Sequence, residues 1–391
     1  MRIPLLLFLA CISSTVSLAQ DTARAARVVG YFPSWSGYGK QYSVADIPAE
    51  QLTHVIYAFA RVGKNGEIVV GDEKLDVKGI AGKTSQYQQL RTLSRKHPRL
   101  KTLISVGGWT WSEHFSDVAA TDKSRQRFAK SVVVFLDKHG FDGIDIDWEF
   151  PVRGGDADNK HRPQDKQNFS WLLAELRKQF KKAGKPWLIT CAVGVIPSHY
   201  KNLEPAKLAK HADWLNLMAY NMSGNWSSVT NFHTALQPAS TDPNKPAVRE
   251  HTNVAAAVSA YIKAGVPAEK IVVGGAMYGR TFRGVTRDNN GLFQTFDSKS
   301  KKPTGIPYRR AKSLIGKGWT RHWHNQARVP WLFNEKERTL IAYDDEQSLG
   351  EKAKFVRDRK LGGMMLWSLS SDDDDHSLVK AVHKVLRSDV R

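Results

Sequence analysis

Three acidic side chains alternate with apolar ones in the stretch 141–151, which reads Phe-Asp-Gly-Ile-Asp-Ile-Asp-Trp-Glu-Phe-Pro. Successive side chains of a β-strand point to opposite faces, so Asp145, Asp147 and Glu149 share one face and the apolar residues between them share the other. Like charges crowded in a poorly solvated interior raise the pKa of some members of the group. A carboxyl group raised in this way stays protonated near neutral pH and serves as a general acid. The stretch therefore predicts acid–base chemistry.

Two structural alternatives compete with this interpretation. The same carboxylates could hold a hard cation, or the stretch could be the surface of a helix. The alternating isoleucines argue against a helix. A cation site would need further oxygen ligands, and the sequence identifies none, so no metal and no cofactor is expected. Asp142 has the opposite parity and is interpreted as structural.

The three acids can face inward only if helices cover the apolar face of their strand. The pattern of the whole chain predicts such an arrangement. Short β-branched and aromatic runs predict eight strands, at 27–32, 53–59, 101–106, 141–149, 187–193, 213–220, 270–278 and 362–368. Segments with helical spacing lie between them, for example 122–140, 166–182, 253–264 and 347–359. This alternation predicts an α/β fold, a (β/α)8 TIM barrel. Active sites of such barrels lie at the C-terminal ends of the strands, where Glu149 would be nearest the opening.

The segment 281–342 does not fit a simple barrel, because ordinary βα loops have about 2–6 residues. A small α+β insertion between strand 7 and strand 8 is expected here, with aromatic residues such as Phe293, Trp319 and Trp331 in its core. The expected organisation is a signal peptide at 1–19, the first part of the barrel at 20–280, the insertion at 281–342 and the last part of the barrel at 343–391.

The first residues are typical of a secretory leader. An apolar stretch at 3–12 is followed by Ser17-Leu18-Ala19, which predicts cleavage after Ala19. The apolar stretch is shorter than the roughly 20 residues that span a bilayer. Export to the periplasm or the extracellular space is therefore expected, without a membrane anchor.

The chain is strongly basic, with 58 Lys and Arg against 38 Asp and Glu and a sequence pI near 9.8. Residues 281–330 hold eleven of the basic residues and only Asp288 and Asp297 as acids. No nucleic-acid-binding motif is present, so nucleic acid is not an expected partner. Loose adhesion to polyanionic surfaces is the expected consequence of the charge.

Several tryptophans fall at or just beyond the C-terminal ends of predicted strands, namely Trp35, Trp109, Trp111, Trp226 and Trp367. Flat rings at these positions can line an apolar binding site. Packing in the core is the alternative for any one of them.

The sequence Asp-Gly-Ile-Asp-Ile-Asp-Trp-Glu at 142–149 resembles the signature of the family 18 glycoside hydrolases, the chitinases and their relatives. Four further motifs resemble the family in the same order along the chain: Ser-Val-Gly-Gly at 105–108, Met-Ala-Tyr-Asn at 218–221, Met-Tyr-Gly-Arg at 277–280 and Gly-Gly-Met-Met-Leu-Trp at 362–367. The resemblance extends from about Val28 to the C-terminus. The segment after Arg280 is similar to an α+β insertion that walls one side of the substrate cleft in one branch of the family.

The resemblance implies a retaining, substrate-assisted mechanism on β-1,4-linked N-acetylglucosamine polymers. Glu149 would protonate the glycosidic oxygen while the 2-acetamido carbonyl of the substrate attacks the anomeric carbon, giving an oxazolinium ion. Asp147 would bind the acetamido N–H and share a proton with Asp145, which Tyr31 and Ser105 would support. Tyr220 would donate to the acetamido oxygen, and Trp367 would form the floor under the sugar.

The catalytic set implied is thus Glu149, Asp147, Asp145 and Tyr220. The substrate-binding set is Tyr31, Phe59, Ser105, Trp109, Met218, Asn221, Trp226, Tyr278, Arg280 and Trp367. Chitin or chitooligosaccharides are the expected partners of a monomeric enzyme. Arg280 could instead form a salt bridge within the barrel.

The sixth-strand motif usually ends in aspartate, whereas this chain has Asn221. An amide brings no negative charge, so Glu149 is expected to lose its proton at lower pH than in relatives. Two rival activities remain on the same scaffold. A chitin-binding lectin would typically lack the acid that Glu149 supplies, and an endo-β-N-acetylglucosaminidase would act on branched N-glycans.

Overall fold

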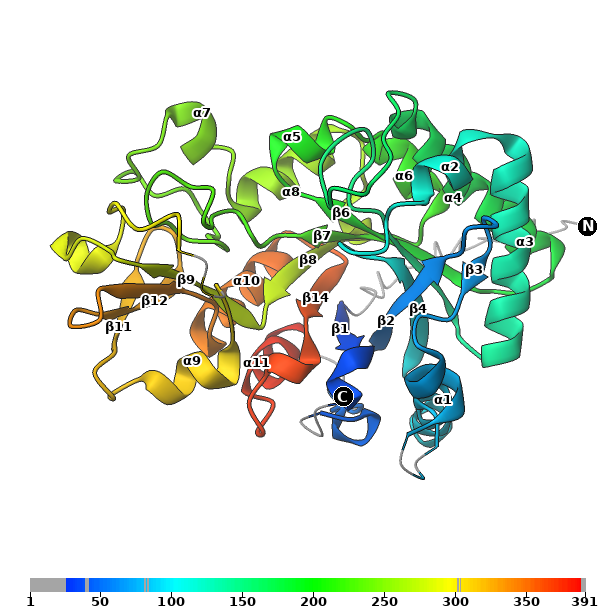
Figure 1. Cartoon of the computed structure of the whole chain (residues 1–391), viewed down its shortest axis with the longest axis horizontal. Coiled ribbons are helices and arrows are strands. Elements are labelled where there is room, and N and C mark those ends of the chain that lie inside the picture. The colour runs from blue at the N-terminus through cyan, green and yellow to red at the C-terminus, as the bar shows by residue number, and fades with distance from the viewer. Residues whose placement is uncertain are drawn as a thin grey trace, which may run out of the picture.

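Eight parallel strands close into a barrel (Figure 1). The computed structural model describes residues 26–38, 42–80, 82, 84–300, 302 and 304–387, so the expected leader 1–19 lies outside the described residues. Each strand pairs with the next around the ring, and β1 closes it by pairing with both β14 and β2. The strands are β1 (Arg27–Pro33), β2 (His54–Val62), β4 (Lys101–Gly107), β5 (Gly143–Asp147), β6 (Leu188–Gly194), β7 (Trp214–Met218), β8 (Ile271–Ala276) and β14 (Gly363–Trp367). The short β3 (Ile68–Val69) is antiparallel to β2.

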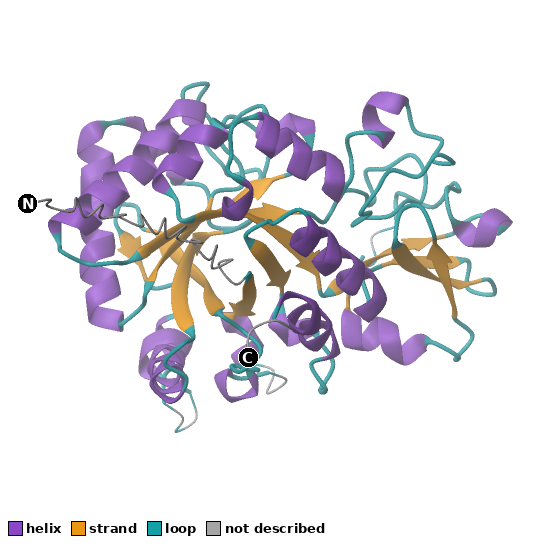
Figure 2. Cartoon of the chain, turned by 180° about the vertical axis from the view of Figure 1, so that it is seen from behind, coloured by secondary structure: helices purple, strands orange, loops and turns teal. Residues whose placement is uncertain are grey.

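Helices cover the outside of the barrel strands (Figure 2). They are α1 (Gln86–Lys96), α2 (Phe115–Ala120), α3 (Asp122–His139), α4 (Asp165–Lys182), α5 (Pro197–Tyr200), α6 (Pro205–His211), α8 (Val254–Lys263), α10 (Glu346–Asp358) and α11 (Ser377–Leu386). The short α7 (Pro246–Arg249) lies in the long loop after β7, away from the barrel (Figure 1). The predicted (β/α)8 TIM barrel is therefore confirmed.

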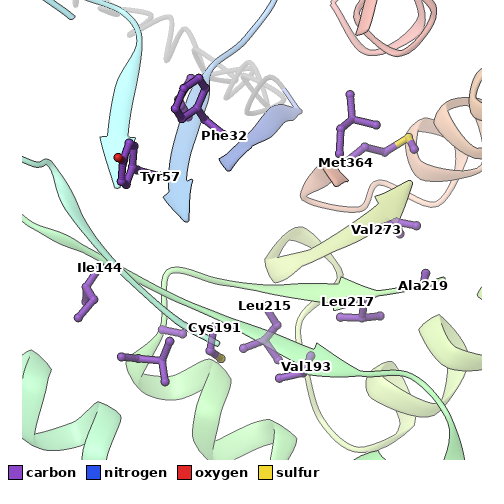
Figure 3. Packing of buried hydrophobic residues seen from close by; sticks show 14 of the residues in the cluster. Phe32, Tyr57, Ile144, Cys191, Val193, Leu215, Leu217, Ala219, Val273 and Met364 are labelled. Atoms are coloured by element: carbon purple, nitrogen blue, oxygen red, sulfur yellow. The ribbon is translucent and has the colours of Figure 1, made fainter. Parts of the chain in front are cut away.

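Alternation along the strands separates two sets of buried side chains. The outward set, including Ile144, Cys191 and Leu217, packs against the helices in the main core (Figure 3). The inward set includes Val29, Ile56, Leu103, Trp214 and Val272 and fills the barrel. Because this set is bulky and apolar, the barrel is a packed core rather than a pore.

A second, antiparallel sheet lies between β8 and β14 along the chain, beside the barrel (Figure 1). Its elements are β9 (Tyr278–Arg283), β10 (Gly305–Pro307), α9 (Tyr308–Leu314), β11 (Thr320–His324), β12 (Val329–Asn334) and β13 (Thr339–Ala342). β9 begins two residues after β8 ends, so one predicted strand, 270–278, is divided between two sheets. The apolar cluster of this sheet includes Phe282, Leu292 and Trp331, and it also takes in Phe232 and Ala235 from the long loop after β7.

No helix within the described ranges is both long and apolar enough to cross a membrane.

Candidate active site

The three acids predicted from the sequence are carried by β5 and the residues just after it. Asp145 and Asp147 are buried, and Glu149 lies two residues beyond the end of the strand. The apolar residue between the last two acids, Trp148, is buried on the other side and stacks on Phe115, with ring centroids 5.5 Å apart. The alternation of β5 therefore directs the acids inward and the apolar residues toward the helices.

Asp145 is held by donors from four other strands. Its Oδ2 accepts hydrogen bonds from Tyr31 Oη at 2.8 Å and Ser105 Oγ at 2.7 Å. Its Oδ1 accepts from Thr190 Oγ1 at 2.6 Å and Asn216 Nδ2 at 3.2 Å. Burial raises the pKa of Asp145, and these hydrogen bonds oppose that rise because they favour the charged form.

Asp147 has a different environment on the same strand. Its Oδ1 is buried and has no hydrogen-bond partner within the described residues. Burial, and then the nearby charges of Glu149 and Asp145, hold the pKa of Asp147 well above its ordinary value. The protonated form of Asp147 is therefore favoured more than it would be in an exposed aspartate.

Glu149 has a pKa that burial raises to about 7. Its backbone is fixed on both sides, because Ser112 Oγ accepts from its N–H at 2.9 Å and Asn159 Nδ2 donates to its carbonyl oxygen at 2.6 Å. The end of β4 approaches the same segment closely. A Cβ on Gly107, which has φ of +107°, would lie 2.4 Å from the carbonyl oxygen of Asp147. Only glycine fits there.

Tyr220 follows β7 and lies close to all three acids. Burial, then Tyr278, and then the charges of the three acids raise the pKa of its phenol well above 10, so the hydroxyl stays protonated and can donate a hydrogen bond. Its ring meets that of Tyr278 edge to face at 6.0 Å. Met218, the last residue of β7, is half-buried and packs with the barrel interior.

Asn221 is bound by two of the other predicted site residues. Its Oδ1 accepts from Tyr278 Oη at 2.7 Å and from Arg280 Nε and Nη2 at 3.0 and 2.8 Å. Arg280 also donates to Thr304 Oγ1 at 3.2 Å. The guanidinium of Arg280 therefore meets a neutral amide oxygen, and the structure gives it no salt bridge with an acid of the described ranges.

The predicted aromatic residues divide into a cluster and isolated exposed rings. Trp367 lies 5.4 Å from Tyr31, 5.7 Å from Phe59 and 6.3 Å from Trp35 between ring centroids. Trp109 and Trp226 are exposed, and Arg280 lies over the ring of Trp226 at 5.9 Å. Trp111 is half-buried under Arg61. The structure thus gathers most of these rings at the strand ends that hold the acids.

Four residues at the site were missed in the sequence. Thr190 and Asn216 face inward on β6 and β7, so strand parity could have identified them. Ser112 and Asn159 lie in loops that follow β4 and β5, and no periodic signal marks them. The described residues contain no group of three or more His, Cys, Asp or Glu that could hold a metal ion.

Comparison with known proteins agrees with the geometry. Residues 27–372 match the model of the glycosyl hydrolases family 18. The chain is 39% identical to chitinase A1 of Niallia circulans over 418 aligned positions, which cover 94% of this chain and 60% of that protein. The chain therefore spans less than two thirds of that relative's length.

Two solved structures share the fold over nearly the whole chain. Chitinase ChiA74 from Bacillus thuringiensis is 33% identical with a TM-score of 0.84, and the match covers 92% of this chain and 70% of that one. A family 18 N-acetylglucosaminidase from Paenibacillus barengoltzii is 30% identical with a TM-score of 0.78, and the match covers 92% and 99%. The barrel, the acids of β5 and the match over 27–372 lead to one conclusion: this chain is a glycoside hydrolase and belongs to family 18 of the glycosyl hydrolases.

Proposed function

We propose that this protein is a chitinase that hydrolyses β-1,4-linked N-acetylglucosamine polymers with help from the substrate's own acetamido group. The burial of Asp145 and Asp147 carries the proposal. Asp145 is buried under four donors and Asp147 is buried beside it, so Glu149 is the one partly exposed acid of the row and no second carboxylate is placed to attack a sugar. The nucleophile must then come from the substrate.

Glu149 begins the reaction by giving its proton to the glycosidic oxygen as the bond to the anomeric carbon breaks. The acetamido carbonyl oxygen forms the new bond to that carbon, which gives an oxazolinium ion. Asp147 turns toward Glu149, accepts a hydrogen bond from the acetamido N–H and passes its proton to Asp145. Tyr220 donates to the acetamido oxygen. Water then adds to the anomeric carbon as the bond from that carbon to the acetamido oxygen breaks, and Glu149 accepts the proton of the water. The two inversions leave the configuration retained.

The exposed rings at the same end of the barrel support binding of a sugar chain. Trp367, packed on Tyr31 and Phe59, offers a floor under the reacting sugar, while Trp109 and Trp226 offer stacking faces farther out. Tyr278, Asn221 and Arg280 line the side toward the second sheet. We extend the proposal to a monomer that is exported after cleavage behind Ala19.

Products released from chitin oligomers of defined length test the proposal. The wild type should release sugars, Glu149→Gln should lose at least about a hundredfold in rate, and Glu335→Gln, an exposed acid on the second sheet, should match the wild type. Equal release by the wild type and Glu149→Gln would refute the assignment of the acid. Binding without release by the wild type would favour a lectin, and release only from N-glycans would favour an endo-β-N-acetylglucosaminidase.

A further inference from the structure

The end of the barrel opposite the acids is built from the connections that lead from each helix to the next strand. The acids lie where the parallel strands end, so the other end is where they begin. Helices arrive there through short connections (Figures 1 and 2). We call this end the base and define it by residues 93–101, 136–143, 179–188, 208–214, 260–271 and 355–363, each running from the last helical turn to the first strand residue.

Charge is distributed unequally between the two ends. The base carries fourteen Lys and Arg against five Asp and Glu. The loops that leave the eight barrel strands, at 34–53, 63–85, 108–121, 148–164, 195–204, 219–253, 277–345 and 368–376, carry 24 acids against 22 Lys and Arg among their described residues. The molecule therefore has a basic base and a catalytic end with almost no net charge.

The acids of the base do not neutralise its surplus. Four of the five already form ion pairs: Asp142 with Lys101, Asp137 with Lys185, Asp213 with Arg177 and Asp358 with Arg357. Exposed lysines remain beside them, and Lys138, Lys181 and Lys263 have no ion pair with a described residue. The helix dipole favours basic residues in the C-terminal turn of a helix, and this effect explains each basic residue of the base taken on its own. Six such turns at one end nevertheless sum to one positive field.

We propose that the base adsorbs to an anionic phospholipid surface and directs the catalytic end away from it. The cations come from the ends of six helices arranged around the barrel, so a planar charged surface can meet them together, whereas the backbone of a nucleic acid would follow a single track. The catalytic end carries almost no net charge, so the same surface attracts the base more strongly, and this difference fixes the orientation. Ile262 is the exposed large apolar side chain of the base, so adsorption is electrostatic and reversible.

Sedimentation with large unilamellar vesicles tests the proposal. The full chain should bind vesicles that contain equal amounts of phosphatidylglycerol and phosphatidylcholine, and should dissociate from them as NaCl rises from 0.05 to 0.5 M. It should not bind vesicles of pure phosphatidylcholine. Each basic residue at the surface should raise the partition coefficient about fivefold. Lys138→Gln, Lys181→Gln and Lys263→Gln combined should lower the partition at least about tenfold. The matched control combines Arg310→Gln, Lys317→Gln and Lys336→Gln, exposed residues of the segment between β10 and β13, and should lower it far less.

Three results would overturn the proposal. Equal losses in the two triple variants would show that net charge acts without regard to the base. Equal binding to pure phosphatidylcholine would exclude an electrostatic surface. Tight binding of duplex DNA at 0.15 M NaCl, lost in the base variant and accompanied by no vesicle binding, would assign the base to a nucleic acid.

Orientation has its own readout. Vesicle-bound protein should hydrolyse a soluble chitooligosaccharide at the rate of the free protein, because the catalytic end faces the solution. Inhibition on vesicles would contradict the orientation. A chain without any hydrolytic activity would refute the proposed function, while the vesicle measurements would still decide the adsorption.

Discussion

The acids of β5 share a strand and differ in what surrounds them. Asp145 accepts four hydrogen bonds, Asp147 has a buried oxygen without a partner, and Glu149 sits at the end of the row with a pKa of about 7. Spacing alone predicted that they share a face. It could not predict which would be charged, because that depends on side chains from β1, β4, β6 and β7, which only the closed barrel brings together.

Glu149→Gln should stabilise the protein at alkaline pH. A raised pKa means that the folded state binds a proton that the unfolded state releases above about pH 4.5, so the wild type loses stability as pH rises from there to about 7. The variant escapes that loss and should gain about 1–3 kcal/mol in the free energy of unfolding at pH 8, with little gain at pH 4. Urea unfolding of both proteins at the two pH values measures this. An equal gain at both pH values would contradict it.

Asn221→Asp should move the alkaline limb of activity upward. A carboxylate at the position that now accepts from Tyr278 and Arg280 disfavours ionisation of Glu149, and Arg280 neutralises part of the effect. The shift should be about half a pH unit in kcat/KM. Asn325→Asp, an exposed change between β11 and β12, should leave the profile unchanged. If the alkaline limb of Asn221→Asp did not move, the charge at position 221 would have no effect on the ionisation of Glu149, and the prediction would be wrong.

Elements were predictable where a local pattern decides them. The helix expected over 122–140 is α3, Asp122–His139, and Gly140 ends it in the left-handed conformation. Its cap is Thr121, whose hydroxyl accepts from the N–H of Ser124, and Asp122 is the first helical residue. The strand expected over 141–149 is shorter, Gly143–Asp147, because pairing with both neighbours stops before Glu149. Such boundaries depend on partner strands that a single segment does not reveal.

Gly107→Ala tests the close approach of β4 to β5. The new Cβ would meet the carbonyl oxygen of Asp147, and φ of +107° is unfavourable for alanine. The change should cost about 2–3 kcal/mol of unfolding free energy and most of the activity. Gly350→Ala is the control, because its Cβ in helix α10 meets nothing within 4 Å and should stabilise by about 0.5–1 kcal/mol. Thermal unfolding with activity assays compares them, and a neutral Gly107→Ala would contradict the account.

At the scale of the whole molecule, the barrel and the second sheet are connected by residues that no local sequence pattern identifies. The barrel class followed from the order of strands and helices along the chain. The sequence did not predict that Phe232 and Ala235 belong to the core of the second sheet. They lie in a loop without periodicity, and their contacts are formed by tertiary packing. A buried ion pair, Lys352 with Asp344, lies behind β8, and Asp344 also accepts from the N–H of Ala276.

Lys352→Met should be strongly destabilising. It leaves the Asp344 carboxylate buried without its cation, which costs about 3–5 kcal/mol. Lys354→Met on the exposed side of the same helix should cost no more than about 0.5 kcal/mol. Adding Asp344→Asn to Lys352→Met should recover much of the loss. Denaturant unfolding measures all four proteins, and equal effects of the two single lysine changes would refute the argument.

The rate dependence on the substrate's acetamido group tests the central claim most directly. Chitooligosaccharides whose reacting sugar carries N-acetyl, N-fluoroacetyl or N-trifluoroacetyl present carbonyl oxygens of falling nucleophilicity at nearly constant shape. If that oxygen attacks the anomeric carbon, kcat should fall as fluorine is added, by about a hundredfold or more for the trifluoroacetyl sugar. This loss corresponds to an increase of about 3 kcal/mol in the activation free energy. Equal kcat values across the series would show that the carbonyl does not take part and that one of the acids of β5 is the nucleophile.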